Sequence, residues 1–290
     1  MRKIEASELI LNDDGSIYHL CLKPGQVAQT VITVGDPDRV AKVTKHFDTL
    51  EYSIHHREFI TETGSYKGKR FTVISSGIGT DNIDIVLNEI DAVVNIDFDT
   101  RTVKKNLKSL DIVRIGTSGS IQEDIPVDSL LISEYGLGLD CMLQAYDCED
   151  IFEKDIVEAF IEHSNWNEKR GIPYIVQGNT DLLNKMKSNQ TKIGCTATMN
   201  GFYGPQSRVL RIPVKDQILN EKMSDFNYNG IRITNLEMET ASIYGLSKKL
   251  GHRALSMNAI LANRVQGTFS KNPSALVEKL ILYTLDKLAA

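Results

Sequence analysis

The chain has 290 residues, of which 41% are hydrophobic and 24% charged, and its net charge is −5. That composition is typical of a globular protein, and the acidic balance argues against a nucleic-acid-binding surface. No apolar run approaches the ~20 residues that a membrane-spanning helix needs, and residues 1–8 lack the apolar core of a signal peptide. Four scattered cysteines without a Cys-x-x-Cys pair favour neither a zinc site nor disulfides. We therefore expect a cytoplasmic protein that binds neither nucleic acid nor membrane.

Strands and helices alternate in the first part of the chain, and glycines stand between them. The β-branched residues 30–34 predict a buried strand, and Asp36 and Pro37 after it are typical of a helix start. The glycine loop at 76–82 also lies between a strand and a helix, but it is not a dinucleotide-binding fingerprint. The other predictions here are a strand at 54–64, a hairpin turn at 65–70, a strand at 71–75, a helix at 83–89 and a charged helix or excursion at 91–108.

Residues 111–120 (Asp-Ile-Val-Arg-Ile-Gly-Thr-Ser-Gly-Ser) carry the strongest chemical signal. Residues 112–115 predict a short buried strand, interrupted by Arg114, a charge that cannot be buried alone. The pattern then predicts that the strand breaks into a turn of glycines and hydroxyls at 116–119. Backbone N–H groups, two hydroxyls and a guanidinium at one strand end suit an oxyanion such as phosphate. The alternative is an ordinary turn in which Arg114 pairs with a carboxylate.

The second half of the chain adds two stretches rich in polar groups. The loop at 199–208 holds an aromatic pair, a Gly-Pro bend, an amide and an arginine, which together could bind a planar polar ring. Residues 237–246 predict a helix with acids in its first turn, and these acids either cap the helix or bind sugar hydroxyls. The remaining predictions are strands at 130–135, 172–177, 193–198, 231–236 and 254–261, and helices at 152–164 and 275–288.

Polar groups thus recur where predicted strands end. Open α/β sheets bind ligands at the carboxyl ends of their strands, so we expect these groups to gather at one site. The sequence contains no linker, repeat or low-complexity segment. Residues 1–290 are therefore interpreted as one α/β domain.

Taken together, these stretches resemble the nucleoside phosphorylase superfamily, and within it the uridine phosphorylase family. The match runs from about Tyr18 to the C-terminal helix, in the family's order. The resemblance implies a single-domain three-layer α/β/α fold with a central mixed, partly barrel-like sheet. The stretches that carry it are 35–39, 56–59, 76–79, 114–119, 202–208 and 237–239.

The resemblance also implies the roles of individual residues. His19 and Arg57 would reach into the pocket of a neighbouring subunit, and Glu239 would grip the ribose 2′- and 3′-hydroxyls. The implied catalytic residues are Arg114, Gln206, Arg208 and Glu239. Phosphate would be bound by Gly35, Arg39, Arg57, Arg114 and Thr117, the ribose by His19, Glu237, Met238 and Glu239, and the base by Ser118, Gly119, Phe202, Gln206, Arg208 and Arg264.

The implied reaction is reversible phosphorolysis of uridine to uracil and α-ribose 1-phosphate, as in pyrimidine salvage. Gln206 and Arg208 match the pair that uridine phosphorylases direct at the uracil edge. Purine relatives place an aspartate after the last strand, where this chain has Asn263-Arg264. The alternatives are a purine nucleoside phosphorylase, a nucleosidase that uses water, or a non-catalytic nucleoside-binding protein. Deoxyuridine and thymidine are further candidate substrates that the sequence does not rank.

The resemblance implies inorganic phosphate as co-substrate and no metal or organic cofactor. It leaves room for K⁺ at a subunit interface near Glu58 and Ile78, although Asn82 replaces a serine there. It further implies a homo-oligomer, with a dimer as the minimal unit and a hexamer as the expected assembly. Two features depart from the family: residues 91–110 form a longer segment, and Gly204-Pro205 stands where many relatives have Pro-Gly.

Overall fold

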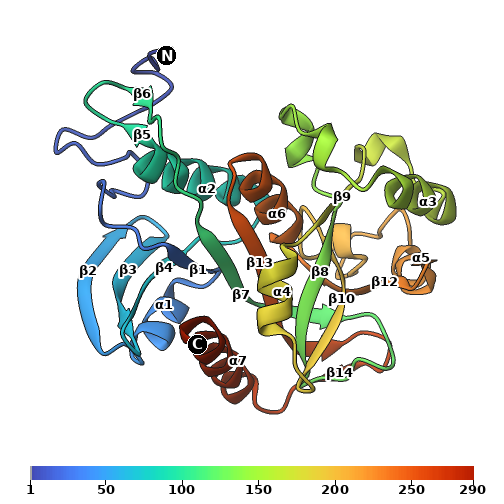
Figure 1. The fold of residues 1–290 in the computed structure, drawn as a ribbon. Coiled ribbons are helices and arrows are strands. Elements are labelled where there is room, and N and C mark those ends of the chain that lie inside the picture. Colours follow the sequence, from blue (N-terminus) through green and yellow to red (C-terminus); the bar gives the residue numbers. More distant parts are fainter. Residues whose placement is uncertain (1) are drawn as a thin grey trace.

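The computed structural model describes residues 2–290 and shows a large mixed sheet with helices on both faces (Figure 1). Its strands follow the order β11-β12-β10-β8-β13-β7-β1-β4-β3-β2, with β9 paired to β8 and β14 to β13. These strands are β1 (Thr30–Val34), β2 (Thr49–His56), β3 (Phe59–Tyr66), β4 (Lys69–Ser75), β7 (Asp111–Ser120), β8 (Leu130–Gly138), β9 (Tyr174–Gln177), β10 (Thr191–Thr198), β11 (Asn227–Tyr228), β12 (Ile231–Glu237), β13 (Arg253–Asn263) and β14 (Thr268–Phe269).

Five of these strands close into a barrel. β7 pairs in parallel with β13, which pairs antiparallel with β8, and β8, β10 and β12 follow in parallel. The ring closes because β12 also pairs with β7, through Asn235 opposite Ser120 and Leu236 opposite Gly119. β7 is therefore shared between the barrel and the open half of the sheet, which β1, β4, β3 and β2 form. The predicted mixed, partly barrel-like sheet is confirmed.

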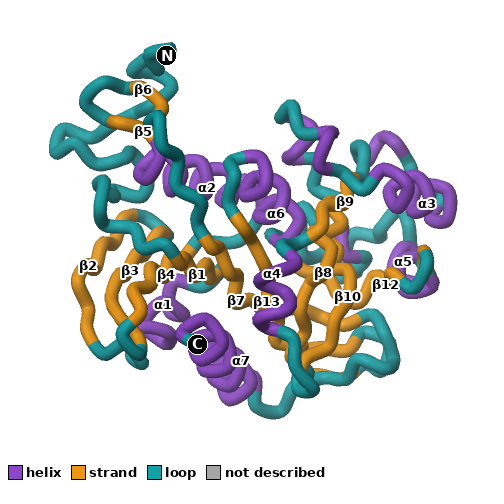
Figure 2. Tube along the Cα trace, in the orientation of Figure 1, coloured by secondary structure: helices purple, strands orange, loops and turns teal. Residues whose placement is uncertain are grey.

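The helices complete a three-layer α/β/α arrangement (Figure 2). Along β1, Val31 packs in the core beneath α2 and α6, whereas its neighbour Ile32 packs in the core beneath α1, α4 and α7. This two-residue alternation is the ordinary consequence of strand geometry, and it gives the sheet two apolar faces to cover. A third cluster joins the barrel to α3 and α5. The helices are α1 (Pro37–Thr44), α2 (Thr80–Asn95), α3 (Lys154–Ser164), α4 (Thr180–Met186), α5 (Leu219–Asp225), α6 (Thr240–Lys249) and α7 (Pro273–Ala289).

Several predicted boundaries are wrong, and three of them have a clear physical cause. The predicted single strand at 54–64 is split between β2 and β3, because the chain turns at Arg57, whose φ of 54° is left-handed. The predicted break at 116–119 is absent, because β13 and β12 hold this part of β7 extended through Ser120. The helix predicted from 237 begins at Thr240, since Glu237 still belongs to β12.

The longer segment at 91–110 continues α2 to Asn95 and then forms a small hairpin, β5 (Ile96–Asp97) with β6 (Thr102–Val103). Arg101 in this hairpin donates through Nε to the carbonyl of Ile4 at 3.0 Å, so the hairpin anchors the N-terminal segment. Within residues 2–290, no helix combines the length and the apolar character needed to cross a membrane.

Candidate active site

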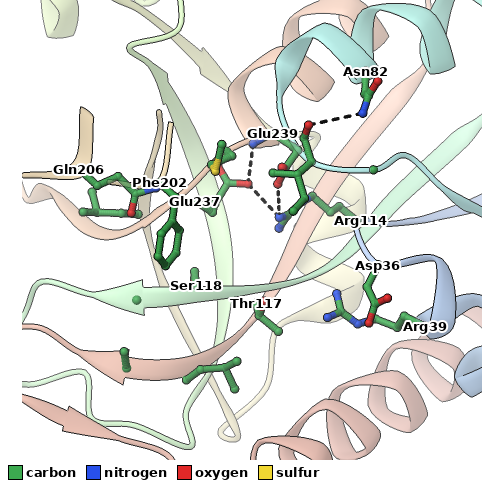
Figure 3. Close-up of a pocket in the computed structure, with 18 of the residues that line it drawn as sticks. Asp36, Arg39, Asn82, Arg114, Thr117, Ser118, Phe202, Gln206, Glu237 and Glu239 are labelled. Atoms are coloured by element: carbon green, nitrogen blue, oxygen red, sulfur yellow. Dashed lines mark hydrogen bonds and ion pairs between the residues drawn. The ribbon is translucent and has the colours of Figure 1, made fainter. Parts of the chain in front are cut away.

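A cavity of about 730 Å³ lies along β7 and beside the carboxyl ends of β1, β4 and β12 (Figure 3). Its walls come from segments far apart in the sequence, which the shared strand β7 brings together. Most of the predicted site residues line this cavity. They are Gly35, Arg39, Arg114, Thr117, Ser118, Gly119, Phe202, Gln206, Arg208, Glu237, Met238 and Glu239.

Arg114 lies in the buried centre of the site, with only 5% of its surface exposed. Its Nη2 lies 2.5 Å from Glu239 Oε2 and 3.2 Å from Glu237 Oε2 (Figure 3). Its Nη1 donates to Asn258 Oδ1 at 3.1 Å. Burial disfavours the charged guanidinium, but the two carboxylates raise the pKa of Arg114 above its ordinary value. Arg114 therefore pairs with carboxylates and lines the cavity, so both sequence interpretations describe part of its environment.

Gly116 explains how this guanidinium fits against its own strand. A Cβ at position 116 would lie 1.8 Å from Arg114 Nη1 and 2.3 Å from its Cζ. The Arg114 side chain thus folds over the bare backbone two residues further along the same face of β7. Glycine is required here to leave room for a side chain, and the strand remains regular.

The two acids after β12 have different tasks. Glu237 accepts hydrogen bonds from the Thr198 hydroxyl at 2.7 Å and from the backbone N–H groups of Glu239 and Thr240 at 3.0 Å, so it caps the start of α6. Burial raises the pKa of Glu237, although Arg114 opposes that effect. Glu239 accepts from the backbone N–H of Gly79 at 2.8 Å and holds Arg114 with its other oxygen. The carboxylate of Glu239 thereby links the start of α2 to β7.

Arg39, like Arg208, forms no ion pair with a carboxylate among residues 2–290, whereas Arg114 pairs with two. Arg39 Nη1 donates to the carbonyl of Ile115 at 3.3 Å, and its Nε is buried without an acceptor. Burial lowers the pKa of Arg39, and the positive charge of Arg114 lowers it further. A bound anion would relieve both effects. Gly35 and the hydroxyl-bearing Thr117 line the same end of the cavity.

The opposite end of the cavity is built from the loop after β10. Arg208 lies over the ring of Phe202, with its Cζ 3.8 Å from the ring centroid. Its Nη1 donates to Gln206 Oε1 at 2.5 Å and to the carbonyl of Phe202 at 2.6 Å. Burial lowers the pKa of Arg208 to about 10, with a smaller contribution from Arg264, so the guanidinium remains charged at neutral pH. Gln206 is only 2% exposed.

Three predicted residues lie outside the cavity wall. Arg264 donates to the backbone carbonyl of Gln206 at 2.5 Å, so it holds the loop at 199–208 in place. His19 and Arg57 both lie near Tyr18: the centroids of the His19 and Tyr18 rings are 4.7 Å apart, and the Arg57 Cζ is 5.7 Å from the Tyr18 ring centroid. The two residues assigned to a neighbouring pocket thus lie together, away from the pocket of their own chain.

Several lining residues received no role in the sequence analysis. Asp36, Leu236, Leu261 and Ala262 follow or end strands, which was a usable signal, whereas nothing in the sequence marks Phe269 on the short strand β14. Other residues lie at the part of the cavity where a monovalent cation was expected. These are Glu58, Ile78 and Asn82, and Asn82 Nδ2 donates to the carbonyl of Ile78 at 3.5 Å.

The fold is that of the phosphorylase class: the family model of the Phosphorylase superfamily matches residues 29–280, and the chain belongs to that superfamily. It is 30% identical over 280 residues to the uridine phosphorylase of Thermococcus kodakarensis, a match that covers 93% of this chain and 86% of the relative. It is 26% identical over 247 residues to the DeoD-type purine nucleoside phosphorylase of Listeria welshimeri, covering 82% and 84% of the two chains.

Solved structures show the same fold. The nucleoside phosphorylase of Trypanosoma brucei, described as showing uridine phosphorylase activity, superposes with a TM-score of 0.86 at 28% identity and covers 97% of this chain and 99% of that one. A uridine phosphorylase of the oomycete Phytophthora capsici gives a TM-score of 0.71 at 20% identity, covering 100% and 99% of the two chains.

Proposed function

We propose that this protein catalyses the reversible phosphorolysis of uridine to uracil and α-ribose 1-phosphate. The observation that carries the proposal is the order of charges along one cavity. At one end lies the guanidinium of Arg39, which has no ion-pair partner within residues 2–290. A carboxylate pair lies in the middle, and a buried amide with Arg208 lies at the other end. The same order holds for phosphate, ribose and base when a nucleoside is bound next to phosphate.

The phosphate end is proposed to hold the nucleophile. Arg39 supplies a charge without a partner, Thr117 a hydroxyl and Gly35 a backbone that a ligand can approach closely. Arg114 adds positive potential from one side while it remains bonded to Glu239. Holding phosphate against the sugar would convert a bimolecular encounter into a positioned one, worth up to ~7–11 kcal/mol in favourable cases.

The ribose end of the mechanism rests on Glu239, with Glu237 and Met238 beside it. A carboxylate accepts hydrogen bonds from two adjacent hydroxyls, and Glu239 is fixed for that task by Gly79 and Arg114. As the glycosidic bond breaks, positive charge develops on the sugar, as in other glycoside chemistry. The negative carboxylate and the phosphate on the opposite face would both stabilise it.

The base end is proposed to stabilise the departing uracil anion. Arg208 and Gln206 would donate to its oxygens, and a well-placed donor of this kind contributes on the order of 3 kcal/mol. Phe202 offers an aromatic face beside Ser118 and Gly119. No covalent intermediate is required, because phosphate itself is the nucleophile.

A pyrimidine is favoured over a purine by Asn263 and Arg264, at the end of β13. By the resemblance, purine relatives have Ser-Asp at these two positions, and their aspartate protonates the base. Here Arg264 stands in the aspartate's position, and it donates to the carbonyl of Gln206 at 2.5 Å. Asn263, in the serine's position, is 1% exposed and does not line the cavity. Its Nδ2 donates to the carbonyls of Gln122 and Ile125 at 2.8 and 3.0 Å, and its Oδ1 accepts from backbone N–H groups. The amide is committed to the fold and has no free group for a base.

The active unit is proposed to be at least a dimer. Arg57 and Glu58 are consecutive at the β2–β3 turn, yet Glu58 lines the cavity while Arg57 lies outward beside Tyr18. A two-fold axis near this turn would bring the partner's copy of the same surface to the cavity mouth. We extend the same proposal to a hexamer built from such dimers and to K⁺ binding near Glu58 and Ile78.

One assay tests the function: release of uracil from uridine, with and without inorganic phosphate, and with inosine as control. We expect uracil release that requires phosphate and is much slower with inosine. Phosphate-independent release would identify a nucleosidase. A preference for inosine would favour the purine activity that the Listeria relative's name describes, and no turnover of either would leave only nucleoside binding.

A further inference from the structure

The carboxylate of Glu89 on α2 is bonded entirely to His19 and its neighbour. Glu89 Oε1 lies 2.6 Å from His19 Nδ1, and the backbone N–H of His19 donates to the same carboxylate at 3.0–3.1 Å. The backbone N–H of Leu20 donates to Oε2 at 2.9 Å. From the other side, His56 Nδ1 donates to the carbonyl of His19 at 2.9 Å. Glu89 and His56 thus fix both the backbone and the ring of His19.

The bond from Glu89 also decides which ring nitrogen of His19 carries hydrogen. An ionised carboxylate only accepts, so His19 Nδ1 must be the donor, and in the neutral ring Nε2 then holds a lone pair. Nε2 has no hydrogen-bond partner within residues 2–290, and 26% of the His19 side chain is exposed. The ring therefore presents an acceptor to its surroundings. A sugar hydroxyl is a donor of matching chemistry.

We infer that Glu89 is a positioning residue for nucleoside recognition, which holds His19 as an acceptor for the ribose 5′-hydroxyl in the neighbouring subunit's cavity. This rests on the proposed function. Glu89 and Asn82 lie two helical turns apart on one face of α2, about 10 Å, and Asn82 lines the chain's own cavity. In this proposal α2 contributes to two cavities. Its first turn lines the cavity of its own chain, and Glu89 orients His19 toward the cavity of the neighbouring subunit.

The test compares uridine with 5′-deoxyuridine, which lacks the hydroxyl in question, in wild type and in Glu89→Gln at saturating phosphate. The glutamine has one acceptor oxygen for three donors, and its NH₂ group favours the opposite His19 tautomer. Loss of one such hydrogen bond predicts a roughly 3- to 10-fold fall in kcat/KM for uridine. We expect little change in kcat/KM for 5′-deoxyuridine. When His19→Ala is already present, adding Glu89→Gln should not lower kcat/KM for uridine further.

Asp91→Asn is the matched control, because Asp91 is also a carboxylate on α2 that faces a histidine, 3.2 Å from His252 Nε2, but it lies outside the cavity. Asp91→Asn should leave the ratio of kcat/KM for uridine to kcat/KM for 5′-deoxyuridine at its wild-type value. If Glu89→Gln does not fold, Glu89→Asp, which keeps the charge but draws it back from the ring, carries the same comparison.

Three outcomes overturn the inference: an unchanged kcat/KM for uridine in the Glu89 variant, an equal loss of kcat/KM for both substrates, or a loss that persists in the His19→Ala background. The last two would mean that Glu89 only supports the fold. A wild type that releases no uracil from uridine with phosphate would instead overturn the proposed function, and the two failures are therefore distinct.

Discussion

At the scale of single residues, the unpaired charge of Arg39 gives the sharpest prediction. Arg39→Ala should raise the KM for phosphate at least about 10-fold, because the variant loses a charge-assisted contact worth roughly 1.5–3 kcal/mol. Stability should change little, since Arg39 holds no carboxylate of the fold within residues 2–290. Steady-state kinetics at varied phosphate measures the effect. Lys42→Ala is the control: Lys42 is an exposed cation on the same helix, and its removal should leave the KM for phosphate unchanged.

Arg208 lies at the other end of the cavity, so its loss should affect kcat/KM for uridine more than the KM for phosphate. We expect Arg208→Ala to lower kcat/KM for uridine on the order of 100-fold, because a donor to the developing uracil anion is removed. The KM for phosphate should stay within about 3-fold of wild type, less than 1 kcal/mol. If Arg208→Ala changes kcat/KM for uridine and the KM for phosphate by the same factor, the loop at 199–208 supports the structure of the whole cavity.

At the scale of elements, buried threonines on two strands provide a matched pair. Thr198 on β10 donates to Glu237 at 2.7 Å and accepts from the N–H of Ala241 at 2.9 Å, whereas Thr33 on β1 has a buried hydroxyl without a partner. Thr198→Val should therefore lower the free energy of unfolding by roughly 1–3 kcal/mol. Thr33→Val should be neutral or stabilising. Urea unfolding of both variants measures the difference, and equal values would refute the role given to the Glu237 cap.

The elements also show what a sequence can and cannot reveal. Residues 30–34 are a strand because local β-branching and burial agree, and that prediction is confirmed. Gly116 and Gly119 favoured a turn, yet neighbouring strands hold them extended, and strand pairing is not a local property. The turn at Arg57 was missed because a non-glycine residue there adopts a left-handed φ.

For the site, the sequence indicated the polar groups that follow strands, and most of them do line one cavity. It could not reveal that Arg114 would be bonded to Glu237 and Glu239, more than a hundred positions away, because that pairing depends on the closure of the barrel. Nor could it reveal that Arg39 would have no carboxylate partner within residues 2–290. The phosphate, ribose and base assignments remain predictions for the experiments above.

At the scale of the whole molecule, the position of Arg57 predicts complementation between subunits. Arg57→Ala and Glu239→Ala should each be nearly inactive alone. After dissociation and random reassembly of an equal mixture, half of the dimers combine both variants, and one of the two sites in each is intact, which restores about a quarter of the sites. Activity of the mixture, compared with each variant treated alike, measures this. No recovery would mean that each chain supplies its own Arg57.

The space above Gly116, which the Arg114 guanidinium fills, restricts how this protein can change over evolutionary time. Any other residue at position 116 would put its Cβ in the space of the Arg114 guanidinium, which would then have to move away from its two carboxylates. Replacing Arg114 first abandons two buried carboxylates, which is equally damaging. A substitution at either position alone should therefore be damaging, and we expect the arginine and the glycine to be inherited together.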